Sequence, residues 1–268
     1  EYCDLLVTGS GPAGLSSAYS AAKNGAKVIL AEDKPRFGGS LLTDDVTIDN
    51  LSGKAWADKI ITELKEMPNV IVKNRSQVFG YYDHNMMVMF ERTGDHLNNK
   101  PKYTPRQKLW YIRAKEVLLS TGSIERPIVF GNNDTPGVFL SAAAKEYIKV
   151  YGVLVGKKPL IFTNNDSAYE TALEFKKQGI EPIILDTRNE QSSELIDAAK
   201  NQKIKIKFSY AVIAANGYKK VKSAQIGKLN KDKTGFENTE TIDCDCICVS
   251  GFWTPTVHLA SQSGNKLK

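Results

Sequence analysis

The sequence predicts an α/β fold with two parallel-sheet units, the second inserted into the first. Three observations predict it: an apolar strand that runs into a glycine turn and a helix at the amino end, the return of the same strand–turn–helix–strand order from residue 158, and a last apolar strand, Asp243–Val249, expected to rejoin the first sheet. We therefore expect residues 1–135 and 236–268 to form a dinucleotide-binding domain, with residues 136–235 as an inserted second domain of similar plan.

The first strand ends in a glycine-rich turn. Leu5–Val7 is a short apolar run, typical of a parallel strand covered on both faces. Gly9 permits a tight turn, Gly11 leaves room for a pyrophosphate, and Gly14 lets the following helix pack closely on the strand. The free N–H groups at the start of that helix would face the phosphates. The turn predicts dinucleotide binding in preference to a purely structural role, with these candidate contacts: Gly9, Ser10, Gly11, Pro12, Ala13 and Gly14.

An acidic residue ends the next predicted strand, Lys27–Ala31. Glu32 stands where a carboxylate can accept hydrogen bonds from the ribose hydroxyls of an adenosine. Such an acid favours a free 2′-hydroxyl, and therefore NAD or FAD over NADP. Asp33 is a further candidate contact, while Lys34 and Arg36 close behind keep NADP open.

Other stretches are candidate approaches to the same ligand. A glycine pair follows the acidic strand end, in a loop that would border the pyrophosphate, although an ordinary turn remains an alternative. Two later apolar strands also run into a glycine, which repeats the context of the first motif. A further strand would pass near an adenine. The candidates are Gly39 and Ser40 in the glycine-pair loop, Thr121, Gly122 and Gly251 after the two later strands, and Val78 in the strand near the adenine.

The second strand–turn–helix–strand unit has no glycine in its turn. The strand Lys158–Phe162 leads into residues 163–167, Thr-Asn-Asn-Asp-Ser, and the returning strand ends at Asp186 in the place of Glu32. Asparagine can adopt left-handed conformations, but side chains there would crowd a pyrophosphate. We expect this domain to bind no dinucleotide, or to bind one poorly. A modified working site is the alternative, and the polar residues could equally be helix caps, as we expect of Ser141.

The remaining elements follow from hydrophobic periodicity and turn signals. An amphipathic helix is expected over Ala55–Met67, a polar loop over 95–106 and an antiparallel meander within 211–242. Strands are expected over 70–72, 77–82, 86–91, 107–113, 116–120, 181–186 and 204–210. Helices are expected over 141–150, after residues 163–168 and through Lys177, and over 195–199.

Composition and charge exclude several classes of partner. The chain has 268 residues, 41% of them hydrophobic, and a net charge of +6 spread without a dense basic run. We expect no nucleic-acid partner and, since no apolar stretch is long enough to span a bilayer, no membrane. The sequence begins almost at once on a strand, without Met or a signal peptide, and ends without an obvious terminal element, so we expect a fragment of a longer polypeptide.

No catalytic or metal-binding constellation is visible. The four cysteines, Cys3, Cys244, Cys246 and Cys248, form no C-x-x-C pair, and the last three alternate, so they should share one face of a strand as small buried hydrophobes. This usage fits a reducing cytoplasm. The three histidines stand apart from any acid, serine or cysteine at a catalytic spacing, so any redox chemistry would belong to a cofactor.

Several motifs resemble known families. The glycine turn and residues 38–42 resemble the flavoproteins with two dinucleotide-binding domains, which implies two Rossmann-like (glutathione-reductase-type) nucleotide-binding domains, the second inserted in the first. More specific blocks resemble the alpha subunit of heterotetrameric sarcosine oxidase, and together they extend over essentially the whole chain: Val78–Asn85, Arg106–Trp110, Glu125–Pro127, Phe162–Tyr169, Ser250–Pro255 and His258–Gly264.

This resemblance implies a cytoplasmic enzyme of four different subunits. It would oxidise sarcosine to glycine with oxygen, give hydrogen peroxide, and pass the one-carbon unit to tetrahydrofolate as methylenetetrahydrofolate. The alpha subunit would carry NAD at its amino-terminal nucleotide fold, while FAD and covalent FMN would belong to the beta subunit or the alpha–beta interface. The beta, gamma and delta subunits would be partners. The implied NAD contacts are Gly9, Ser10, Gly11, Gly14, Glu32, Gly39, Ser40, Val78, Thr121 and Gly122.

Two other hypotheses remain. The chain could be a stand-alone FAD- or NAD(P)-dependent oxidoreductase, although the missing redox cysteine pair and the glycine-poor second turn argue against it. It could also be a non-catalytic scaffold that keeps the fold without the ligand. The glycine fingerprint alone does not separate NAD from FAD, since both use the same turn.

Overall fold

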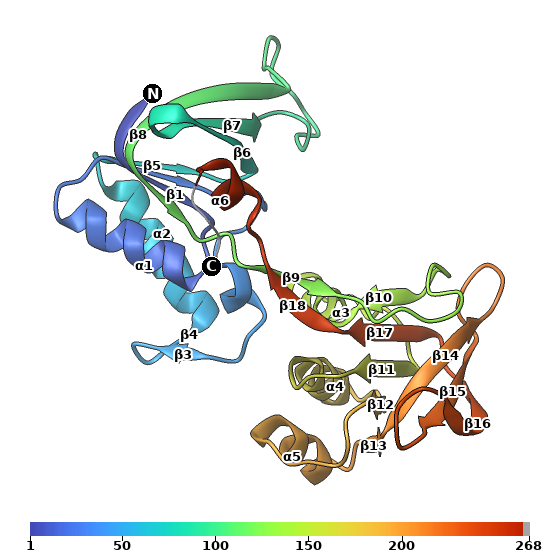
Figure 1. The fold of residues 1–268 in the computed structure, drawn as a ribbon. Helices are drawn as coiled ribbons and strands as arrows, with labels where there is room; N and C mark the ends of the chain where they lie inside the picture. Colours follow the sequence, from blue (N-terminus) through green and yellow to red (C-terminus); the bar gives the residue numbers. More distant parts are fainter. Residues whose placement is uncertain (265–268) are drawn as a thin grey trace. The chain divides into compact units, whose positions relative to one another are not determined.

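The computed structural model describes residues 1–264, so the last four residues of the expected first domain lie outside the described residues (Figure 1). The chain forms two compact units. One contains Glu1–Ser123 and the residues from Pro255 on, and the other contains Ile124–Thr254. The second unit is therefore inserted into the first along the sequence.

The division differs from the expected boundaries at residues 135 and 236, because residues 124–135 and 236–254 belong to the second unit. The prediction that the last apolar strand rejoins the first sheet is wrong. That strand, β17 (Cys246–Ser250), pairs in parallel with β10 (Val138–Leu140) and β11 (Pro159–Thr163) of the second unit. An apolar strand buried on both faces fits the centre of either sheet, so its hydrophobicity did not identify its neighbours.

The first unit is built on a six-stranded sheet of order β5-β2-β1-β8-β7-β6. Neighbouring strands β5, β2, β1 and β8 run parallel, and β7 and β6 continue the sheet antiparallel. Strand β8 is one long element, because its first half pairs with β7 and its second half with β1, where the sequence suggested two strands. The strand bounds are β1 (Tyr2–Thr8), β2 (Val28–Ala31), β5 (Val70–Lys73), β6 (Ser76–Tyr82), β7 (Met86–Arg92) and β8 (Gln107–Leu119).

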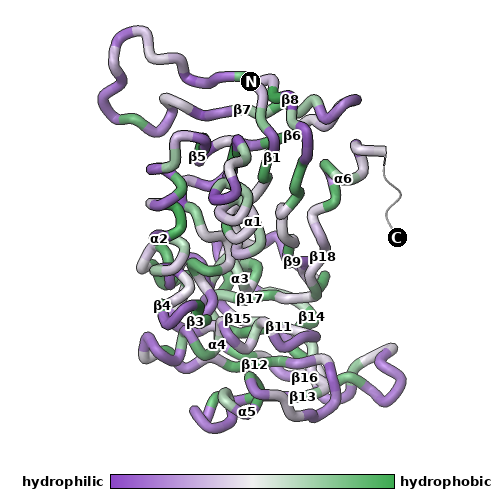
Figure 2. Tube along the Cα trace, turned by 90° about the vertical axis from the view of Figure 1, so that its left-hand side faces the viewer, coloured by the Kyte–Doolittle hydropathy of each residue, from purple (hydrophilic) through white to green (hydrophobic). Residues whose placement is uncertain are grey.

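Helices α1 (Pro12–Lys23) and α2 (Gly53–Glu66) pack on one face of β1 and β2, around Leu15, Leu30 and Leu64 (Figure 1). On the other face, Met87 and Ile112 of β7 and β8 join a second cluster with Leu6, Ile29 and Leu259 of the short helix α6 (His258–Gln262). Smaller elements complete the unit: η1 (Gly39–Leu42), β3 (Thr47–Ile48), β4 (Leu51–Ser52) and η2 (Asp83–Asn85). The loop between β7 and β8 is polar, as predicted, and is mostly purple in Figure 2.

The second unit repeats the parallel plan. Its five-stranded sheet has the order β10-β17-β11-β12-β13 and carries α3 (Ser141–Tyr151), α4 (Ser167–Lys177) and α5 (Glu194–Asn201). The predicted antiparallel meander is present as a separate three-stranded sheet. The remaining bounds are β12 (Ile183–Asp186), β13 (Lys205–Phe208), β14 (Tyr210–Asn216), β15 (Ser223–Leu229) and β16 (Phe236–Asp243), with the paired strands β9 (Ser123–Arg126) and β18 (Phe252–Pro255).

All four cysteines are free and buried. Cys246 and Cys248 share one face of β17, as their alternation predicts, but Cys244 packs in a different cluster because it precedes the strand. Burial raises the pKa of Cys3 to about 11 and that of Cys244 to about 12. These thiols therefore stay protonated near neutral pH and act as small core side chains.

Candidate dinucleotide site

The carboxyl ends of three parallel strands of the first unit meet at one edge of its sheet. Strand β1 lies between β2 and β8, and its chain crosses through α1 to β2, so β1 marks the point where the strand order reverses. The Gly9 amide donates to the Ala31 carbonyl at 2.8 Å, and the Ser120 amide donates to the Thr8 carbonyl at 2.9 Å. Open α/β sheets bind ligands at this position.

The three fingerprint glycines have different surroundings. A Cβ on Gly9, where φ is +99°, would lie 2.3 Å from the Ser120 carbonyl oxygen, and a Cβ on Gly14 would lie 2.0 Å from the Gly9 carbonyl oxygen. A Cβ on Gly11 would meet nothing within 4 Å. Packing therefore requires the first and third glycines, while the second faces open space where a phosphate could approach the backbone.

The start of α1 is not capped by its own residues. Gly11 is the N-cap and has no side chain that could cap the helix amides. Pro12 follows it, and the first turn contains no acidic residue. Pro12 and Ala13 are exposed. At the end of β1, the buried hydroxyl of Thr8 has no hydrogen-bond partner. An uncapped helix start with a partial positive charge fits an anion such as a pyrophosphate.

Glu32 follows β2 and is directed toward the glycine turn, with only 6% of the residue exposed. Its Oε2 accepts hydrogen bonds from the Ser10 amide at 2.9 Å and the Ser10 hydroxyl at 2.5 Å, and its Oε1 accepts from the Lys34 amide at 2.9 Å. Burial raises the pKa of Glu32, Asp33 raises it further, and the bonds from Ser10 and Lys34 oppose the shift. These donors hold the carboxyl group at the glycine turn, where a ribose hydroxyl could reach it.

The predicted loop residues lie against the turn. The Gly38 amide donates to the Ser10 carbonyl at 3.1 Å, and a Cβ on Gly39 would lie 2.8 Å from the Gly11 Cα. Ser40 is exposed on η1. The loop is therefore in backbone contact with the glycine turn, as a pyrophosphate-bordering segment requires.

The segment after β8 is tied to the end of the same unit. The Thr121 hydroxyl donates to the Thr256 carbonyl at 2.8 Å, and the Thr256 amide donates to the Gly122 carbonyl at 2.9 Å. A Cβ on Gly122 would meet nothing within 4 Å. Thr121 thus anchors the segment, and Gly122 leaves its outer side open.

Two predicted contacts are not gathered with the others. Val78 is buried in the cluster of β6–β8, so only its main chain is available to a ligand. Gly251 lies in the second unit, where its amide donates to the Arg126 carbonyl at 2.6 Å. A Cβ there would lie 2.9 Å from that oxygen and 3.0 Å from Pro127, so the approach of this neighbouring chain explains the glycine.

The corresponding turn of the second unit is filled by its own side chains. The Asn165 amide group donates to the Ser250 hydroxyl at 3.0 Å, and its Oδ1 accepts from the Ser167 amide at 3.1 Å. The Trp253 indole N–H donates to the Ser167 hydroxyl at 2.9 Å. Groups that would face a pyrophosphate in a working site are paired with one another here.

The acid of the second unit is also occupied. Asp186 is fully buried, accepts from the Tyr169 hydroxyl at 2.8 Å and forms an ion pair with Arg188 at 2.7 Å, and Arg188 also pairs with Asp166 at 2.7 Å. The carboxylates raise the pKa of Arg188, and burial raises that of Tyr169. The sequence patterns did not predict this cluster, although an arginine two residues after the strand-end acid is a signal for such an ion pair.

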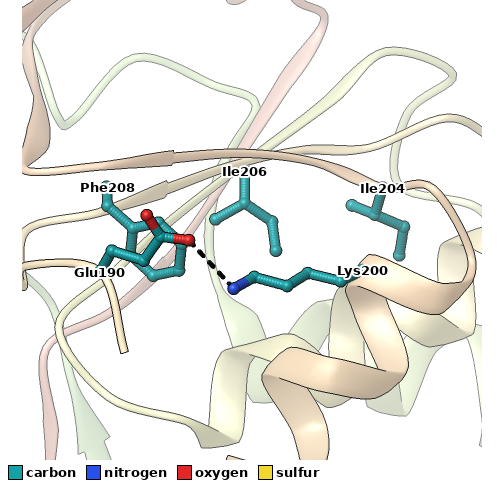
Figure 3. Close-up of a pocket in the computed structure, with 5 residues that line it drawn as sticks. All are labelled: Glu190, Lys200, Ile204, Ile206 and Phe208. Atoms are coloured by element: carbon teal, nitrogen blue, oxygen red, sulfur yellow. Dashed lines mark hydrogen bonds and ion pairs between the residues drawn. The ribbon is translucent and has the colours of Figure 1, made fainter. Parts of the chain in front are cut away.

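A cavity of 470 Å³ lies elsewhere in the second unit. Ile204, Ile206 and Phe208 point to the same side of the segment around the edge strand β13, and Lys200 of α5 pairs with Glu190 at 3.1 Å beside them (Figure 3). None of these residues is a sequence-predicted contact, and the only polar groups among them are already paired.

The described residues contain no group of three His, Cys, Asp or Glu side chains that could hold a metal ion. Within the same residues, no helix is long and apolar enough to cross a bilayer.

A glycine turn, an uncapped helix start and a strand-end acid at the reversal of a doubly wound sheet define a class, the dinucleotide-fold oxidoreductases. The chain belongs to the pyridine nucleotide-disulphide oxidoreductase family, whose profile matches residues 3–268. This family binds FAD or NAD(P), and the predicted fold class is confirmed. The family name refers to a disulphide, but the four cysteines here are free.

Curated relatives are more specific. Sarcosine oxidase subunit alpha of Rhizobium meliloti (strain 1021) is 37% identical over 266 residues, which cover 99% of this chain and 26% of that protein. The protein of the same name from Corynebacterium sp. (strain P-1) is 35% identical over 99% of this chain and 28% of its own length. The resemblance to sarcosine oxidase alpha subunits is confirmed, and the chain spans about a quarter of their length.

Among solved structures, thioredoxin reductase of T. acidophilum is similar with a TM-score of 0.75. The match covers 100% of this chain and 82% of that chain, with 15% of residues identical. This likeness concerns the fold.

Proposed function

We propose that the first unit binds NAD at the carboxyl ends of β1, β2 and β8, as the cofactor-binding part of a sarcosine-oxidase-like amine oxidase. The convergence of the glycine turn, Glu32 and the Gly122 segment on one sheet edge carries this proposal. Sequence identity to sarcosine oxidase alpha subunits over 99% of the chain supports the choice of reaction class.

Each group in the site has a distinct task. The amides at the start of α1 bind the pyrophosphate, with Gly11 allowing the backbone to approach it. Glu32 binds a ribose hydroxyl, and the buried carboxylate excludes a 2′-phosphate by charge repulsion. NAD bound here would support the fold more than it would supply chemistry, because the acid of the site, Glu32, is hydrogen-bonded to the glycine turn and is assigned to the ribose.

The proposed amine oxidation takes place on partner subunits. Sarcosine, oxygen and tetrahydrofolate would give glycine, hydrogen peroxide and methylenetetrahydrofolate, with FAD and FMN held by the beta subunit or at its interface with this chain. The beta, gamma and delta subunits are therefore the proposed partners, in the cytoplasm.

A second candidate is a stand-alone flavoprotein, favoured by the family match alone. In it, the same turn would hold FAD. The two candidates differ in the ligand that the purified chain carries, since only FAD absorbs visible light.

The test is mass spectrometry of the ligand released from the purified chain, combined with its absorbance spectrum. We expect NAD and a colourless protein. Added NAD at 100 times its Kd should raise the free energy of unfolding of the ligand-free chain by about 2.7 kcal/mol. A yellow protein that releases FAD would support the stand-alone flavoprotein, and a chain that neither retains nor responds to a dinucleotide would support a scaffold without ligand.

A further inference from the structure

The side chain of Ser10 joins three segments of the candidate site. The residue is fully buried in the glycine turn. Its hydroxyl donates to Glu32 Oε2 at 2.5 Å and accepts from the Gly38 amide at 3.2 Å. One hydroxyl therefore links the turn, the strand-end acid and the loop that borders the predicted pyrophosphate position.

We infer that Ser10 is a positioning residue, whose hydroxyl fixes the Glu32 carboxylate for a ribose diol without contacting the nucleotide through its own side chain. The inference rests on the proposed dinucleotide site. It assigns the selectivity for ribose hydroxyls to Ser10 and Glu32 together, whereas the sequence pattern assigns it to Glu32 alone.

Donor and acceptor counting supports this role. A serine hydroxyl has a single proton, and here that proton is committed to Glu32. With the Ser10 amide on the same oxygen at 2.9 Å, Oε2 has two donors. Oε1 accepts from the Lys34 amide at 2.9 Å. Oε1, with fewer of these donors, is therefore the oxygen offered to a ribose diol, and its direction is set by the bonds that hold Oε2.

Burial makes this support necessary. Glu32 is 6% exposed, so water cannot replace a lost hydrogen bond at low cost. Without the Ser10 hydroxyl, Oε2 would keep only the amide, and the carboxylate would be free to rotate away from the sugar. The phosphate-binding amides of α1 do not involve this hydroxyl, so their contribution should be unchanged.

The test compares two ligands that differ only in the sugar hydroxyls. Binding of ADP and of 2′,3′-dideoxy-ADP is measured by calorimetry on the full chain after bound nucleotide is removed. The variants are Ser10→Ala, Ser10→Cys, which keeps the volume, and Glu32→Ala. Ser20→Ala, an exposed serine on α1, is the matched control.

We expect Ser10→Ala to weaken ADP binding about tenfold, as the loss of a hydrogen bond to a charged group predicts, and dideoxy-ADP binding less than about twofold. Glu32→Ala should show the same selectivity, Ser10→Cys an intermediate loss, and Ser20→Ala none. If the thermal transition shows that Ser10→Ala does not fold, the losses of ADP and dideoxy-ADP binding in Ser10→Cys test the inference instead.

Equal losses for both ligands would overturn the inference, because they would show that Ser10 acts on the turn as a whole. Unchanged ADP affinity in Ser10→Ala would overturn it as well. In either case normal ADP binding by the unmodified chain leaves the proposed site standing. If the unmodified chain binds neither ADP nor NAD, the proposed site itself is wrong and the inference with it.

Discussion

At the scale of single residues, the glycine turn separates packing from binding. Gly9 and Gly14 have no room for a Cβ because backbone oxygens lie within 2.3 Å of its position, whereas Gly11 has open space around it. Alanine at Gly11 should therefore reduce ligand affinity, whereas alanine at Gly14 should reduce stability.

We expect Gly11→Ala to leave the melting temperature almost unchanged and to weaken dinucleotide binding by about tenfold or more, because its methyl group occupies the approach of the pyrophosphate. Gly14→Ala should lower the free energy of unfolding by about 1–3 kcal/mol through overpacking. Calorimetric binding and thermal melts of both variants check this. A destabilised Gly11→Ala with normal affinity would contradict the assignment of the open space to the ligand.

A buried ion pair makes a second prediction at this scale. Asp186 is fully buried and its charge is paired with Arg188 at 2.7 Å. Arg188→Leu should destabilise the second unit by about 3–5 kcal/mol, since it leaves a buried carboxylate without its counter-charge. Urea unfolding measures the loss. The exposed Lys219→Leu is the control, and an equal loss there would show that the effect is not specific to the pair.

At the scale of elements, helix α3 is capped from outside its own sequence. Ser141, the predicted N-cap, is the first helical residue, and its buried hydroxyl has no hydrogen-bond partner. Instead the carboxylate of Glu125, on β9, accepts from the Ala142 amide at 2.7 Å. A carboxylate near the helix start also complements its partial positive charge.

Removing this external cap should cost more than removing the predicted one. We expect Glu125→Ala to lower the free energy of unfolding by about 1–3 kcal/mol, because the amide of half-buried Ala142 loses its acceptor. Ser141→Ala should change it by less than about 0.5 kcal/mol, since its hydroxyl makes no bond. Urea unfolding compares the two variants. A larger loss of stability in Ser141→Ala would show that Ser141, and not Glu125, caps the helix.

The same carboxyl gives a pH dependence of stability. Burial raises the pKa of Glu125, and bonds from Ser250 and Ala142 only partly oppose the shift. The folded chain therefore keeps this proton to higher pH than the unfolded chain, so stability falls as pH rises from the ordinary glutamate value to the raised one. Glu125→Gln should reduce this fall, measured as the difference in unfolding free energy between acidic and neutral pH. If stability falls with pH as much in Glu125→Gln as in the unmodified chain, other groups cause the fall. Glu32, whose pKa is also raised, is one of them.

At the scale of the whole molecule, the sequence predicted the local units better than their neighbours. The β1–α1–β2 turn was readable because each glycine, the alanine-rich helix and Glu32 are local signals with one physical meaning. The membership of β17, the external cap on α3 and the pairing of Asp166 with Arg188 depend on contacts between residues far apart in the sequence. Such contacts leave no periodic pattern in the sequence, so only the folded chain reveals them.

The two units share the order of four parallel strands, β5-β2-β1-β8 in the first and β13-β12-β11-β17 in the second. They differ in what fills the turn after the first strand of the crossover. In the first unit that place is bordered by an open glycine and an uncapped helix. In the second it is filled by Asn165, Ser167 and their partners. We therefore expect one dinucleotide bound per chain. Calorimetric titration of the ligand-free chain with NAD should give a stoichiometry of one, and Gly11→Ala should lose that binding step.

A stoichiometry of two would mean that the second unit binds NAD as well, and NAD binding that survives Gly11→Ala and is lost on Asn165→Ala would place the working site in the second unit. Asn165→Ala is informative because it removes a side chain from the filled turn without adding bulk. We expect NAD binding to be retained in Asn165→Ala and lost in Gly11→Ala. This result would mean that both units have the crossover but only the first unit binds the ligand.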